Sequence, residues 1–141
     1  MKPNKILIIL IFLFSLITIP LGQKIWSNAP GMQPNSTQLL FFMGISFFEA
    51  MSFAAGICFL LFAWPLLKKV SKKSKDLVIL TYLSIAWSLL SWWPHDRLHA
   101  HVGDNLDSLI WIEYSFHVSL IFAAVVIGYF FYTVILERNL K

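Results

Sequence analysis

Four long apolar runs constrain the fold of this chain more than any other feature. They cover residues 6–21, 37–67, 77–93 and 108–136. A transmembrane helix needs roughly 20 mostly apolar residues, so the runs have the length of membrane spans. Backbone polar groups in lipid must be satisfied within a helix or a closed barrel. The sequence therefore predicts an all-α membrane protein, in which residues 1–141 form a single domain of four transmembrane helices in an antiparallel bundle.

Composition supports a membrane environment. Hydrophobic residues make up 58% of the chain and charged residues 13%, whereas soluble domains have roughly 45–50% and about 25%. The lipid bilayer is therefore the expected partner. The net charge of +4 lies almost entirely in loops on one side, which excludes nucleic acid as the expected partner. Cys58 is the single cysteine, so no disulfide forms within the chain.

The basic residues predict the orientation of the chain in the cell membrane. Nine of them fall on one side of the predicted spans: Lys2, Lys5, Lys68, Lys69, Lys72, Lys73, Lys75, Arg138 and Lys141. Only Lys24 and Arg97 fall on the other. Because basic loops stay in the cytoplasm, both termini are predicted to be cytoplasmic. The first run resembles a signal peptide, but no clear small-x-small cleavage site follows it, so we expect it to remain as the first span.

The chemistry of the chain is concentrated in residues 92–117, which contain all four histidines and four of the seven acidic residues. The third run is expected to end at Pro94, followed by a turn-rich, extracytoplasmic connection. His95 and His99 are four residues apart, as are Glu113 and His117, so each pair shares a helix face if its segment is helical. Consecutive helices are usually neighbours, which would bring both pairs to one outer edge of the bundle.

This edge is a candidate metal site. Imidazole and carboxylate groups together suit Zn, Cu or Fe, and one such transition metal ion is the expected cofactor. The expected ligands are His95, His99, His101, His117 and Glu113. Glu113 is also a candidate catalytic residue, either as a ligand or as the group that orients one. A proton relay without metal and plain polar packing are the alternatives for the same residues.

Glu49 is the second candidate catalytic residue. It lies about 12 residues into the second run, which at 1.5 Å per residue is roughly 18 Å along a helix and so near the bilayer midplane. Burying a carboxylate there costs about 2.5–3.5 kcal/mol on insertion scales. We expect Glu49 to be protonated or to face a polar group, and to accept protons beneath the histidines. A neutral, hydrogen-bonded structural Glu49 is the alternative.

Smaller polar signals predict helix ends and helix contacts. Thr37 is expected to cap the second helix, and Asp107 or Ser108 the fourth. A polar stripe runs along the third span and comprises Thr81, Ser84, Ser88 and Ser91. Hydroxyls at such spacing usually hydrogen-bond to their own or a neighbouring helix, so the stripe is expected to be structural.

Three functions remain open on this sequence. The first is a small multi-pass membrane protein with a histidine and carboxylate site, binding metal at the outer mouth of the bundle. The second is an accessory subunit of a larger membrane complex, of the respiratory or membrane copper monooxygenase type, in which these residues are structural. The third is a lipid-modifying or isomerase-type membrane enzyme without metal, using an acid and an imidazole to move protons. Other membrane subunits or a second copy of the chain are the possible protein partners.

Overall fold

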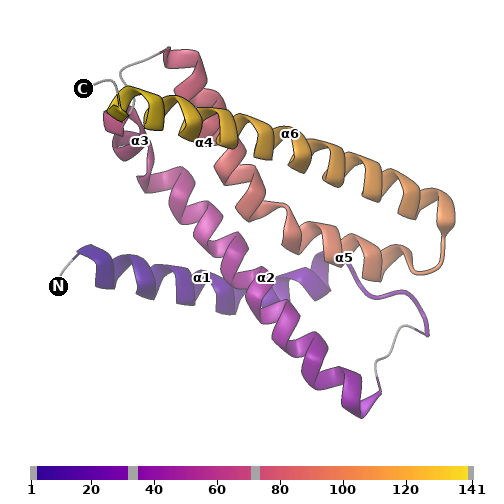
Figure 1. Cartoon of the computed structure of the whole chain (residues 1–141). Coiled ribbons are helices and arrows are strands. Elements are labelled where there is room, and N and C mark those ends of the chain that lie inside the picture. The colour runs from indigo at the N-terminus through magenta and orange to yellow at the C-terminus, as the bar shows by residue number, and fades with distance from the viewer. Residues whose placement is uncertain (1–2, 32–34, 71–73, 140–141) are drawn as a thin grey trace.

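The chain folds into helices throughout the part described by the computed structural model, residues 3–31, 35–70 and 74–139. No strand occurs in these ranges, which confirms the all-α prediction. The helices are α1 (Pro3–Ile25), α2 (Ser36–Phe62), α3 (Trp64–Val70), α4 (Lys75–Leu90), α5 (Trp92–Val102) and α6 (Leu106–Asn139). Figure 1 shows the ribbon running left to right in α1, back in α2, left to right through α4 and α5, and back in α6.

Three of these helices are long and apolar enough to cross a membrane: Lys5–Ile25, Ser36–Phe62 and Leu106–Leu136. A fourth span exists if α4 and α5 are counted together, since they follow one another with a bend of 43°. The chain is therefore a small helical membrane protein with three or four candidate spans. The four-span bundle and the side of the membrane that each end faces remain predictions.

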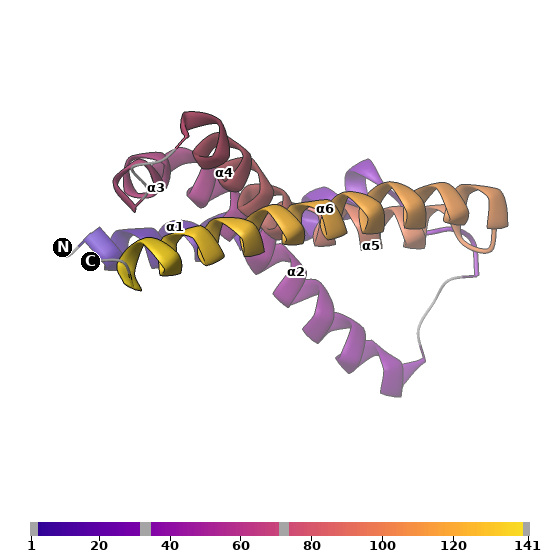
Figure 2. The same ribbon diagram turned by 45° about the horizontal axis from the view of Figure 1, so that its top comes forward.

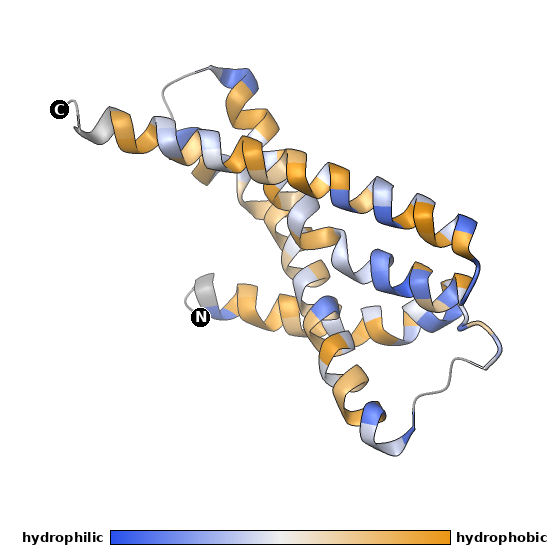
Figure 3. Ribbon diagram, turned by 45° about the vertical axis from the view of Figure 1, so that its right-hand side comes forward, coloured by the Kyte–Doolittle hydropathy of each residue, from blue (hydrophilic) through white to orange (hydrophobic). Residues whose placement is uncertain are grey.

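The helices pack in a chain of neighbours around small side chains. α1 packs on α2, α2 on α4, and α6 on α4 and α5 (Figures 1 and 2). Ala50, Ala54 and Ala86 are buried between them, as expected where membrane helices approach closely. Figure 3 shows hydrophobic residues predominating along α1 and α6, with hydrophilic residues gathered on α5. The polar groups therefore lie at the end of the molecule where α5 and the start of α6 meet.

The helix ends differ from the sequence prediction in several places. α1 continues past Pro20 to Ile25, since membrane helices tolerate an internal proline. Asn35, not Thr37, caps α2: its side chain accepts from the backbone N–H of Gln38 at 2.9 Å, and the Gln38 side chain accepts from the N–H of Asn35 at 3.1 Å. This reciprocal pair satisfies two backbone groups at once.

The end of the second apolar run and the cap of the fourth predicted helix also differ from the prediction. α2 ends at Phe62 instead of residue 67, and the short α3 follows. Pro65 is in the first turn of α3, where a missing N–H costs nothing. The side chain of Asn105 accepts from the backbone N–H of Ser108 at 3.0 Å, so Asn105 is the cap of α6. Asp107 and Ser108 lie inside the helix.

The prediction that the third run stops at Pro94 and becomes a loop is wrong. α4 ends at Leu90 and α5 runs through Pro94 to Val102. Pro94 lies in the first turn of α5, where backbone N–H groups have no partner within the helix, so a residue without an N–H is tolerated there. The missing N–H also means that Pro94 cannot donate to the Leu90 carbonyl. The hydroxyl of Ser52 donates to the Leu89 carbonyl at 2.8 Å and so satisfies an acceptor beside the bend. The histidines thus lie on a helix.

Two hydroxyls of the polar stripe on α4 bond to their own helix, as expected, whereas the Ser91 hydroxyl is buried with no hydrogen-bond partner among the described residues. The Thr81 hydroxyl donates to the Leu77 carbonyl at 2.7 Å and the Ser88 hydroxyl to the Ser84 carbonyl at 2.9 Å, both within α4. Hydroxyls that bond to their own helix are satisfied without a partner from another element. Thr81 and Ser88 are therefore structural.

Gly56 sets the distance between α2 and α4. A Cβ atom at this position would lie 2.7 Å from Leu90 Cγ and 3.1 Å from Leu89 Cβ. We expect Gly56→Val to push the two helices apart and to destabilise the fold by about 1–3 kcal/mol. Thermal unfolding in detergent measures this. Gly44→Val is the control, because a Cβ at Gly44 meets nothing within 4 Å; equal melting temperatures for both variants would contradict the close packing.

The orientation predicted from the basic residues is testable by labelling. Lys75 and Asp104 lie at opposite ends of the α4–α5 pair and are both exposed. In a Cys58→Ser background, we expect Asp104→Cys to react with an impermeant maleimide in intact cells. Lys75→Cys should react only after the membrane is opened, because the lysine-rich end faces the cytoplasm. The reverse pattern would move the histidines to the cytoplasmic side.

Candidate metal centre between α5 and α6

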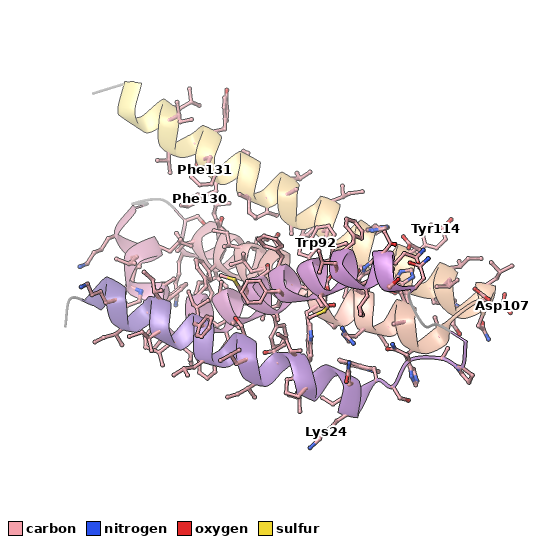
Figure 4. The ribbon with its side chains drawn as sticks, turned by 90° about the horizontal axis from the view of Figure 1, so that it is seen from below. Lys24, Trp92, Asp107, Tyr114, Phe130 and Phe131 are labelled. Atoms are coloured by element: carbon pink, nitrogen blue, oxygen red, sulfur yellow. The ribbon has the colours of Figure 1, made fainter. Side chains whose placement is uncertain are left out.

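The contact between α5 and α6 brings the two predicted pairs of side chains together. Only residues 103–105 separate these helices, and Gly103 makes the turn with a φ of 59°, a conformation that favours glycine. α5 presents His95 and His99, and α6 presents Glu113 and His117. In Figure 4 the side-chain nitrogen and oxygen atoms gather towards Tyr114 and Asp107, whereas carbon predominates around Phe130 and Phe131.

Glu113 is at the centre of the cluster. Its Oε1 lies 3.0 Å from His99 Nε2 and its Oε2 lies 2.6 Å from His117 Nδ1. His95 Nε2 lies 4.0 Å from Glu113 Oε1 and 3.2 Å from His99 Nε2. Three imidazoles from two helices therefore surround one carboxylate.

Three of these side chains have the spacing of metal ligands. One ligand atom each from His95, Glu113 and His117 lie within 4.8 Å of one another. A tetrahedral ion with bonds near 2.0 Å holds its ligand atoms about 3.3 Å apart. Side-chain movements of about an ångström would therefore close this set around an ion. His99 is next to it as a candidate fourth ligand.

Asp96 fixes the orientation of the His95 ring. His95 Nδ1 lies 2.8 Å from Asp96 Oδ1, and a carboxylate oxygen only accepts, so the proton of this bond is on Nδ1. The lone pair of Nε2 then points to the cluster. This arrangement of carboxylate, imidazole and ligand position is typical of metal-binding histidines. Sequence reasoning did not assign this role to Asp96, although an acidic residue next to a candidate ligand is a usable signal.

Glu49 of α2 lies next to Asp96 of α5 and faces polar groups inside the molecule. Its residue is only 9% exposed, and its carboxyl group is close to that of Asp96. Both carboxyl groups line the same cavity between α2 and α5. Beside the pair, Arg97 Nη2 donates to the Ser46 hydroxyl at 3.1 Å. α2 and α5 are thus joined by polar contacts.

The structure does not bring His101 into the cluster. Its Nδ1 donates to the carbonyl oxygen of Ser27 at 2.8 Å, and the side chain is exposed. One residue earlier, the Ala100 carbonyl accepts from the N–H of Ala29 at 2.8 Å. These bonds fasten the segment after α1 to the end of α5. Of the five predicted ligands, the structure gathers His95, His99, Glu113 and His117.

No family model, no curated protein and no solved structure matches this chain. Fold and site together define a class: a small helical membrane protein that carries a histidine and carboxylate cluster between two of its helices.

The contact between Glu49 and Asp96 predicts how substitutions at Glu49 behave. We expect Glu49→Gln to unfold like the unsubstituted protein, because the glutamine amide N–H can donate a hydrogen bond to the Asp96 carboxylate. Glu49→Leu removes this hydrogen bond, and because the Asp96 side chain is 44% exposed and keeps its contact with His95, we expect it to cost about 0.5–1.5 kcal/mol. Thermal unfolding of both variants in the same detergent measures the difference. If Glu49→Leu is as stable as Glu49→Gln, the hydrogen bond contributes nothing.

Proposed function

We propose that this chain is a metal-binding membrane protein that holds one first-row transition metal ion, Zn, Cu or Fe, between α5 and α6. The observation that carries the proposal is the convergence of ligand atoms from His95, Glu113 and His117 within 4.8 Å. His99 is the fourth ligand or donates to Glu113. The site belongs to a multi-pass protein of the cell membrane and opens on the extracytoplasmic side.

The donor set and its support favour a metal over plain polar packing. Imidazole suits Zn, Cu and Fe alike, and a carboxylate completes such sets. The ligands lie on two helices that contact each other directly, which positions side chains more rigidly than a loop does. The 2.8 Å contact from Asp96 to His95 is a second-sphere interaction of the kind that ligating histidines make.

This arrangement assigns separate roles to the two candidate catalytic residues. Glu113 binds the ion directly. Glu49 acts through another residue, because it lies close to Asp96 and Asp96 orients His95. A metal with an open coordination position would supply Lewis acidity or an activated water. Around it, the residues of this chain hold the ion, orient His95 and place the Glu49 carboxyl group nearby.

Metal analysis of the purified full-length protein tests the proposal. We expect close to one equivalent of Zn, Cu or Fe, and we expect the double variant His95→Ala, His117→Ala to lose it. His101→Ala is the matched control: it removes an imidazole from the same helix but not from the cluster, so it should retain the metal.

The outcomes separate the hypotheses. Asp96→Asn should keep the fold while lowering metal affinity about 10–100-fold, the usual cost of losing a second-sphere partner. Protein that contains no metal after growth and purification with each of the three ions would contradict the proposal. So would equal metal content in the double variant. The accessory-subunit hypothesis, in which these side chains are structural, would then be the better account.

A further inference from the structure

Three exposed lysines lie on the short helix that follows α2 and at the start of α4. Lys68 and Lys69 are in the last turn of α3, and Lys75 is the first residue of α4. Asp76 follows Lys75 and offsets one charge, so Lys68 and Lys69 carry the positive excess. In Figures 1 and 2, α3 is at the end of the molecule where α1 begins and α6 ends, away from α5 and the metal centre.

We propose that α3 and the start of α4 bind the headgroup phosphate of an anionic phospholipid, with the acyl chains of the lipid beside Leu66. The inference goes beyond the proposed metal centre and does not depend on it. It is carried by the depth of α3 in the membrane, by the contacts that fix α3 in place, and by the combination of basic and apolar side chains on its exposed face.

α3 lies directly after a candidate membrane span. The apolar stretch of α2 ends at Phe62, and α3 begins two residues later at Trp64. Tryptophan is enriched at the boundary between hydrocarbon and water, where the lipid headgroups lie. The lysines that follow Trp64 by one turn are therefore expected at the depth of the lipid phosphates.

Contacts with α4 fix the position of α3. The hydroxyl of Tyr82 on α4 donates to the Leu60 carbonyl near the end of α2, where helix carbonyls lack partners within the helix. The Trp64 ring packs edge-on against the Tyr82 ring, with centroids 5.3 Å apart, so the first residue of α3 is held against α4. A binding surface that is already held in place loses less freedom on binding than a mobile loop does.

The exposed face of α3 suits a lipid better than it suits water alone. Leu66 is 65% exposed and precedes Lys69 by three residues, so the two side chains are neighbours on one face of the helix. A lysine can lay its hydrocarbon stem along apolar surface and keep its ammonium group at the level of the headgroups. Leu66 would then contact acyl chains, while the ammonium groups of Lys68 and Lys69 contact the phosphate.

Native mass spectrometry of the full-length protein in neutral detergent tests this inference. Phosphatidylglycerol and phosphatidylcholine with the same acyl chains are titrated into separate samples. We expect phosphatidylglycerol to bind at least about fivefold more tightly, which corresponds to the contribution of one lysine near an anionic membrane surface. Glycerol 3-phosphate, which has the phosphate but no acyl chains, should not bind measurably.

Substitutions then assign the binding to α3. The double variant Lys68→Gln, Lys69→Gln should lower the affinity for phosphatidylglycerol at least about tenfold and leave that for phosphatidylcholine unchanged. The double variant Lys5→Gln, Lys24→Gln is the matched control, because it removes the same charge from α1 and should keep the preference for phosphatidylglycerol. Lys68→Arg, Lys69→Arg should also keep it, since arginine retains the charge and binds phosphate.

Three results would overturn the inference. The first is equal affinity for phosphatidylglycerol and phosphatidylcholine. The second is an equal loss in the two glutamine double variants, which would indicate a general effect of net charge. The third is binding of glycerol 3-phosphate as tight as that of phosphatidylglycerol, which would indicate a site for free phosphate esters. All these lysines are exposed, so each variant should unfold at the temperature of the unsubstituted protein in phosphatidylcholine.

Discussion

A charged side chain inside a bilayer must find a polar partner within the protein, and the polar half of this structure depends on that requirement. Glu49 is near the middle of α2 and lies close to Asp96 of α5. Asp96 also accepts from His95, and His95 approaches Glu113 of α6. Polar contacts thus run from one group to the next across three helices. The most deeply buried members are Glu49, whose residue is 9% exposed, and His95, whose side chain is 12% exposed, so these two depend most on their neighbours.

The bend between α4 and α5 makes this arrangement possible. A straight helix would continue the direction of α4, whereas the 43° bend gives α5 a different direction. The bend frees backbone carbonyls, and the hydroxyl of Ser52 on α2 compensates one of them. α2 therefore supports α5 twice, once at the backbone of the break and once at the side chain of Asp96. Broken helices inside membranes are tolerated where protein groups satisfy the freed backbone in this way.

The sequence predicted the helices better than it predicted their ends. Hydropathy located the spans because lipid selects for length and apolarity, but a proline such as Pro94 is compatible both with a helix end and with the first turn of a new helix. Caps were misassigned because several capping residues stand in a row near residues 35 and 105. The residues next to Glu49 and Asp96 in the sequence contain no pattern that predicts their contact. This contact depends on the packing of two helices that are far apart in sequence.

Once residues 92–102 are helical, spacing alone separates the histidines. Residues four apart are neighbours on one face, so His95 and His99 both point to α6. His101 follows His99 by two residues, about 200° further round the helix, and its ring bonds to Ser27 instead. His101 was wrongly predicted to join the cluster because residues 95–101 were expected to form a loop. The pairs His95/His99 and Glu113/His117 could be predicted, because residues four apart share one face when their segment is helical.

The arrangement of nitrogen and oxygen atoms within the cluster explains why a cation suits it. The Asp96 carboxylate accepts from His95 Nδ1, so the lone pair of His95 Nε2 faces the cluster, where His99 Nε2 hydrogen-bonds to it at 3.2 Å. The Glu113 carboxylate lies against the same rings, with Oε1 3.0 Å from His99 Nε2 and Oε2 2.6 Å from His117 Nδ1. A metal ion bound by these nitrogen and oxygen lone pairs would neutralise the carboxylate where the two helices meet.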